Sequence, residues 1–259
     1  MIRKDDEGEA VETLEGGHIY FIYRPRVEQE QVEDADDIQQ LYMVLKPKGK
    51  GKYRLIVLGR RELPDISKRG RSRHWGYVDM VANRPKAVEE AFDEQHYETT
   101  TRGERVRPAG RPVGEGVYRI VRHGDHTHLI YGLELPAKPG EAQKALNIEA
   151  EASYIISIRN PEKPAPPSAG LPKKDRADLP RALQERFEGR QFFDADPPDF
   201  LNHEGVELLL ISAAEDVKEE LGIELDTDDE SESTADVFND LRMERSEHPV
   251  EPLLKGKWA

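Results

Sequence analysis

The chain has 259 residues, and its 38 Lys and Arg against 52 Asp and Glu give a formal net charge of −14. It contains no cysteine, which excludes disulfides, thiol nucleophiles, Fe–S clusters and Cys-ligated zinc. No run approaches the ~18 consecutive apolar residues of a membrane-spanning helix, and the N-terminus lacks the apolar segment of a secretory signal. These features predict a soluble, cytoplasmic protein with a buried core and solvated segments.

The first part of the chain is dominated by patterns typical of β-strands. Residues 1–16 are polar, acidic and without period, which predicts a disordered N-terminus. Short runs rich in Tyr, Ile, Val and Leu follow. A helix is predicted over 85–96, because Asn83 offers an N-cap and Pro85 an early helical position. The predicted strands are His18–Arg24, Gln40–Lys46, Tyr53–Gly59 and His74–Met80.

A second group of strand patterns begins at Gly116 and resembles the first. The matching pairs are Ile19–Ile22 with Val117–Ile120, Leu41–Val44 with Ile130–Leu133, and Tyr53–Pro64 with Ser153–Pro164. Two interpretations are open: duplication of a three-strand unit, or chance similarity between Tyr- and Ile-rich strands that end at proline.

The last hundred residues combine linker, helix and strand signals. Prolines make 161–176 a stiff linker. Helices are predicted over 178–189 and 213–221, with a strand at Gly205–Ser212 between them. The predicted fold class is therefore α+β with mainly antiparallel sheet. Its expected parts are a first β unit with one helix (17–112), a second β unit (113–160), a small α/β segment (177–223) and an acidic, largely disordered tail (224–259).

The basic segment 46–73 is the clearest functional candidate. It carries eleven bases and two acids, whereas 1–40 carries twelve acids and four bases, and 215–232 ten acids and one base. Cations alternate along its first part, which on a strand places them on one face. Such a row could track a phosphate backbone, with nearby aromatic rings stacking on bases. The candidate polyanion-binding residues are Lys46, Lys48, Lys50, Lys52, Arg54, Arg69, Arg71, Arg73 and Trp75. A solvated hairpin edge and neutralisation by the acidic stretches are the open alternatives.

A histidine-rich turn is the second candidate. His123, Asp125, His126 and His128 fall within six residues, and imidazole and carboxylate ligands suit Zn²⁺ or another divalent metal. A polar hairpin is the competing interpretation, because His-Gly-Asp is favourable turn chemistry. No Walker A, G-x-S-x-G or H-E-x-x-H motif is present, so no catalytic residue is assigned and no other cofactor is expected.

The C-terminal tail ends in Leu253, Leu254 and Trp258, which predicts docking on the chain's own body or on a partner. The leading hypothesis is a non-enzymatic intracellular binding protein whose basic face (46–73) engages nucleic acid or an acidic partner. The alternative is a metal-dependent hydrolase centred on His123–His128. A structural protein assembled through the Trp258 tail is a third possibility. No membrane partner is expected.

Overall fold

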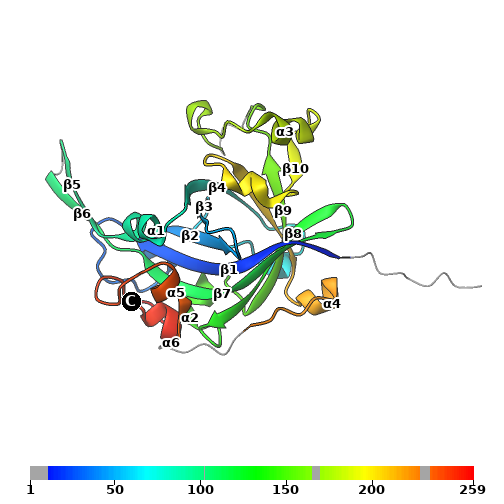
Figure 1. Cartoon of the computed structure of the whole chain (residues 1–259). Helices are drawn as coiled ribbons and strands as arrows, with labels where there is room; N and C mark the ends of the chain where they lie inside the picture. The colour runs from blue at the N-terminus through cyan, green and yellow to red at the C-terminus, as the bar shows by residue number, and fades with distance from the viewer. Residues whose placement is uncertain (1–10, 102, 165–169, 228–233) are drawn as a thin grey trace, which may run out of the picture.

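The structure is a computed structural model that describes residues 11–101, 103–164, 170–227 and 234–259. Its main feature is a closed antiparallel β-barrel (Figure 1). Around the barrel the strands follow the order β9-β11-β4-β3-β2-β1-β7-β8, and pairing of β8 with β9 closes the ring. The strands are β1 (Glu12–Pro25), β2 (Ile38–Pro47), β3 (Tyr53–Leu58), β4 (Arg73–Ala82), β7 (Arg111–His123), β8 (His126–Leu135), β9 (Glu151–Arg159) and β11 (Glu207–Ala214). A short strand, β10 (Phe192–Asp194), extends the sheet along β9.

The barrel is made of two four-strand meanders. Strands β1, β2, β3 and β4 pair in succession, and so do β7, β8, β9 and β11. The first strands of the two meanders pair with each other, and so do the last strands, both antiparallel. The similar strand order of the two halves is compatible with a duplication, which remains a prediction.

Successive side chains of a strand point alternately into and out of the barrel. The inward set fills the barrel interior, and much of the outward set is also buried. In β1, Ile19, Phe21 and Tyr23 belong to the interior cluster. The intervening Tyr20 and Ile22 belong to a second cluster, which lies outside the barrel. Helix α1 (Pro85–Phe92) and the C-terminal helices α5 (Asp236–Asp240) and α6 (Glu251–Lys255) contribute to this outer cluster. Each fully buried side chain of this size stabilises the fold by about 1.5–3 kcal/mol.

Both ends of the barrel are closed by packed side chains. At one end, Ala142 of α2 (Glu141–Ala145) joins the interior cluster and Trp258 packs edge-on against Tyr23, with 5.5 Å between ring centroids. At the other end, Phe200 lies in a short 3₁₀ helix (Pro198–Asn202) and packs against Phe187. The C-terminal tail therefore docks on the chain's own barrel.

The strands expected from the sequence are all present, whereas the helices are shorter than expected. Helix α1 occupies most of 85–96, but α3 (Arg181–Gln184) and the 3₁₀ turn after it cover only the middle of 178–189. Helix α4 (Val217–Leu221) begins late because the Asp216 side chain caps it, accepting from the Glu219 N–H. It ends at Gly222, whose φ of 66° suits glycine.

The antiparallel, mainly β class is confirmed, but the sequence did not predict closure into one barrel. The strand expected at Gly205–Ser212 is β11, which lies between β9 and β4 within the barrel. Strand β1 begins at Glu12, inside the segment expected to lack structure, and the tail contains α5 and α6. Parts of the predicted N-terminus, linker and tail (1–10, 165–169 and 228–233) lie outside the described residues.

A separate hairpin, β5 (Gln95–Thr99) with β6 (Gly103–Arg107), projects from the barrel beside α1 (Figure 1). Within the described ranges, no helix reaches the length and apolarity that crossing a bilayer requires.

Candidate functional site

The basic segment 46–73 does not form one surface. Its first four lysines lie around the β2–β3 turn, while Lys68 and the later arginines lie in or next to the β3–β4 connection, at the opposite end of β3. The six residues of β3 separate these groups by roughly 20 Å at ~3.3 Å per residue. The predicted basic face is therefore divided between two ends of the barrel.

At the lysine end, several cations are used within the molecule. Lys46 pairs with Asp240, and Lys50 pairs with Glu15 at 2.9 Å. Arg54 points into the barrel, is 0% exposed, and forms an ion pair with Glu15. Arg54 therefore cannot belong to a binding surface, and the prediction that it binds polyanions is wrong.

At the other end, Arg60, Arg69, Arg71 and Arg73 are all exposed, and they are named here the arginine cluster. None of the four has an ion pair with an acid in the part of the chain that the structure describes. Backbone hydrogen bonds fix the loop that carries them. The Gly59 N–H donates to the Trp75 carbonyl at 2.6 Å, and the Gly70 N–H donates to the Ser212 carbonyl at 2.7 Å.

An aromatic pair continues the face on which Arg73 lies. In β4, His74, Gly76 and Val78 are buried, so that Trp75 and Tyr77 point outward. Both rings are half-buried and lie side by side, with centroids 5.3 Å apart and planes 33° apart. Arg73, Trp75 and Tyr77 thus form a line of one cation and two rings on the outer face of the barrel.

Buried Glu207 holds Trp75 in place. The Trp75 indole N–H donates to Glu207 at 3.1 Å, and the same carboxylate forms an ion pair with buried Arg159. It also accepts the Leu171 backbone N–H at 2.8 Å. Glu207 was not among the residues expected from the sequence to be functional. Its signal is its position directly before the apolar run Leu208–Ile211, where a buried acid must be paired.

His74, next to Arg73, is buried, and burial lowers its pKa. The nearby charge of Arg60 adds to this effect, although the hydrogen bond with the Glu62 carbonyl opposes it. His74 therefore favours its neutral form. On the outer face of β4, beyond Tyr77, burial and the charge of Glu204 raise the pKa of Asp79.

The histidine-rich turn does not assemble a set of metal ligands. The His123 and His128 rings lie 6.0 Å apart, and His128 Nδ1 is hydrogen-bonded to Ser153 Oγ at 3.0 Å. Among the described residues, His123, Asp125, His126 and His128 do not bring three ligand atoms within 4.8 Å of one another. A metal site here remains a prediction without support from the geometry.

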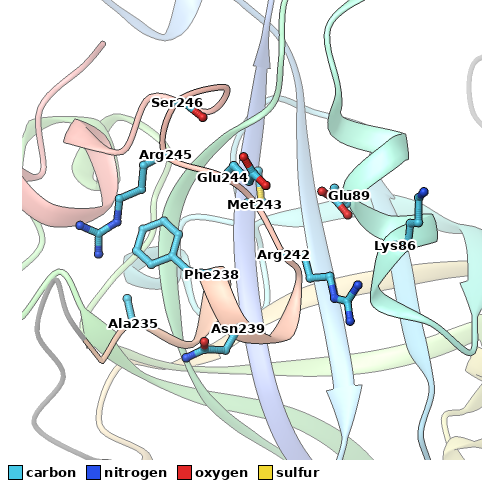
Figure 2. Close-up of a pocket in the computed structure, with 10 residues that line it drawn as sticks. All are labelled: Lys86, Glu89, Ala235, Phe238, Asn239, Arg242, Met243, Glu244, Arg245 and Ser246. Carbon is cyan, nitrogen blue, oxygen red and sulfur yellow. The ribbon is translucent and has the colours of Figure 1, made fainter.

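Two shallow hollows are further features of the surface. One, of about 790 Å³, lies between α1 and the C-terminal segment. Figure 2 shows Phe238 and Arg245 side by side there, with Lys86 and Glu89 projecting from α1 on the opposite side. The Arg245 guanidinium lies 4.3 Å from the centre of the Phe238 ring. The other hollow, of about 950 Å³, includes Arg69, but acids dominate its lining.

Comparison with family models, with curated proteins and with solved structures finds no match to this chain. A function is therefore inferred from the geometry of the surface.

Proposed function

We propose that the protein is a non-enzymatic nucleic-acid-binding protein that takes single strands on the outer face of β4, between the arginine cluster and the Trp75–Tyr77 pair. The aromatic pair carries the proposal. Two half-buried rings held side by side, in line with Arg73, offer stacking surfaces for unpaired bases next to a donor for phosphate. Arginine suits this task because its planar guanidinium binds phosphate through two hydrogen bonds.

Single strands are favoured over duplex because only unpaired bases can reach the rings. An acidic protein partner would use the same arginines but would gain less from stacking. The anchoring of Trp75 by Glu207 also supports the proposal, since a ring that is already fixed loses little freedom on binding.

The test is a fluorescence-anisotropy titration of a labelled single-stranded oligonucleotide, its duplex and a Glu-rich peptide, at about 50 and 200 mM salt. The key variant changes Arg69, Arg71 and Arg73 to Gln. A matched control changes Lys48, Lys50 and Lys52 to Gln, which removes the same charge from the opposite end of β3.

The arginine variant should lose roughly tenfold or more in affinity, and its salt slope should fall by about 2, while the lysine control stays near wild type. Tyr77→Ser should cost about fivefold or more for the single strand and little for the peptide. Equal losses in the arginine and lysine variants would contradict the proposed face. Tighter binding of the peptide than of the oligonucleotide would point to an acidic protein instead.

A further inference from the structure

A second group of chemically active side chains lies where the C-terminal segment meets the end of α1. Asp93 directly follows α1, and Glu247 and His248 are adjacent residues between α5 and α6. One ligand atom from each of these three residues lies within 4.8 Å of the others. Asp93 is far from the other two in sequence, so the folded chain creates this cluster.

His248 is oriented as a metal ligand would be. Its side chain is 0% exposed, and its Nδ1 lies 2.8 Å from the Gly110 carbonyl oxygen. A carbonyl can only accept, so Nδ1 carries the proton and a neutral ring has its lone pair on Nε2. Metal-binding histidines commonly donate their other N–H to a backbone carbonyl in this way.

The atom facing this lone pair is a carboxylate oxygen. His248 Nε2 lies 3.8 Å from Asp93 Oδ1, and both atoms are buried without a hydrogen-bond partner. Two acceptors facing each other in a buried space repel unless a cation lies between them. A proton shared by the pair would bring the two atoms to ~2.8 Å. Ligands at ~2.1 Å around a tetrahedral ion lie about 3.4 Å apart, much closer to the observed spacing.

The surrounding backbone holds these ligands in place. The Arg24 guanidinium donates to the carbonyls of Asp93 and Ala91, and the Gly110 N–H donates to the Phe92 carbonyl at 2.7 Å. Position 110 must be glycine, because a Cβ there would lie 2.6 Å from the Phe92 ring. This close approach places the Gly110 carbonyl where it meets His248.

One member of the cluster, Glu247, faces an acidic hollow on the surface. Glu247 is exposed and lines a hollow of about 380 Å³ together with Glu28, Glu30 and Glu94. Glu28 is paired with Arg105, but these acids still outnumber the one arginine of that lining, Arg111, and the local field favours positive ions.

Another cluster of the same composition shows why these unpartnered atoms matter. His18, Asp236 and Asp240 also bring their ligand atoms within 4.8 Å. There, however, His18 pairs with Asp236 at 2.8 Å, and Asp240 accepts from the Tyr20 hydroxyl at 2.6 Å and pairs with Lys46. That cluster is satisfied by the protein itself and needs no ion.

We propose that Asp93, Glu247 and His248 bind a divalent transition-metal ion of the Zn²⁺ type, which ties the C-terminal segment to the end of α1. One imidazole and two carboxylates suit such an ion, and the nitrogen ligand disfavours Ca²⁺ and Mg²⁺. The site is independent of the nucleic-acid face on β4.

The experiment is calorimetric titration of tag-free, chelator-treated full-length protein with Zn²⁺, and separately with Ca²⁺, alongside thermal unfolding with and without each ion. The wild type should bind one Zn²⁺ per chain and gain thermal stability, with no response to Ca²⁺. Asp93→Asn and His248→Gln should each weaken binding by roughly tenfold or more, and Glu247→Gln should weaken it less.

Two control variants make the result specific. Asp236→Asn alters the satisfied cluster, and His123→Gln with His126→Gln alters the histidine-rich turn; both should bind Zn²⁺ like the wild type. Because His248 is buried, the folding of His248→Gln is checked by circular dichroism without metal. If His248→Gln misfolds, Asp93→Asn tests the site instead, since Asp93 is partly exposed. Absence of saturable Zn²⁺ binding, or binding lost only in the His123 and His126 variant, would overturn the proposal.

Discussion

Arg54 and Glu15 form a two-point ion pair inside one end of the barrel. The guanidinium donates to the two carboxylate oxygens at 2.5 and 3.0 Å, and the exposed fractions of the two side chains are only 0% and 3%. The Tyr118 hydroxyl also donates to Glu15 at 2.9 Å, and Arg54 Nε donates to the Asn202 side chain. This network links β1, β3 and β7 to the 3₁₀ helix that closes this end of the barrel.

Breaking this pair should destabilise the fold strongly. Glu15→Gln removes the counter-charge of a buried guanidinium and should cost about 3–5 kcal/mol of unfolding free energy. Urea denaturation measures this cost, with Lys48→Gln on the exposed turn as a control that stays near wild type. The double variant Glu15→Leu with Arg54→Met should cost less than the sum of its single changes. Strict additivity would show that the two side chains do not act as a pair.

The Arg54–Glu15 pair should also make the stability of the fold depend on pH. Burial raises the pKa of Glu15, but the hydrogen bonds and charge of Arg54, aided by Lys50 and Tyr118, outweigh it and lower the pKa below its ordinary value. The contribution of Glu15 is therefore complete above the unfolded-state pKa and is lost as pH falls through the lowered one. In Glu15→Gln this acid-dependent part of the unfolding free energy should be absent. An unchanged pH profile would argue against the assignment.

Buried His128 should cause a second pH dependence of stability, at milder acidity. Burial lowers its pKa to about 4, and the charges of His123 and His126 add to the shift. In the unfolded chain a histidine takes up its proton near ~6.5, so the unfolded state gains protons first as the pH falls. Stability should drop between these two values, by up to about 3 kcal/mol. Urea titrations from pH 7 to pH 4 should show a much smaller drop in His128→Asn, whereas exposed His126→Gln, which removes only a minor cause of the shift, should stay close to the wild type.

The sequence predicted local structure well because strand signals are local. The runs His18–Arg24 and Tyr53–Gly59 alternate between the two apolar clusters that the barrel buries, and each became a strand. The closure of the barrel depends on pairings such as β4 with β11, between segments far apart in the chain. No local pattern encodes such a pairing, so two units were predicted where one barrel exists.

The candidate surface was predicted only in part, for a related reason. Alternation from Lys46 to Arg54 predicted one continuous face, but the turn between β2 and β3 interrupts it. Lys46 then points outward at the end of β2, while Arg54 points inward at the start of β3. Arg73 and Trp75 did fall on one face, because a single strand carries both. Asp93 and His248 could not be paired by sequence, since only the fold brings them together.

The docked C-terminus should be important for stability. Trp258 packs against Tyr23, and the Val32 N–H donates to the Ala259 carbonyl at 3.0 Å. Trp258→Ala should cost about 3 kcal/mol, at the low end for a tryptophan because the ring is partly exposed. The melting temperature should fall by roughly 6–12 °C, with exposed Lys257→Ala as the unchanged control. A change in oligomeric state by light scattering, without loss of stability, would instead assign the tail to assembly.

Glu207 contributes both to the stability of the barrel and to the proposed binding face. Its carboxylate is paired with Arg159 on β9, and it holds the Trp75 indole on β4. Glu207→Gln leaves the Arg159 guanidinium buried without a counter-charge and should cost about 3 kcal/mol or more. Trp75→Phe keeps an aromatic ring and removes one N–H donor, so it should cost about 1 kcal/mol.

The two variants should also differ in binding. Trp75→Phe retains a stacking surface and should keep its affinity for a single-stranded oligonucleotide within about threefold, whereas Trp75→Ala should lose more. Urea denaturation and anisotropy on the same preparations separate the effects on folding from those on binding. A stability loss in Trp75→Phe as large as that in Glu207→Gln would show that the indole N–H, rather than the Arg159 pair, dominates the role of Glu207.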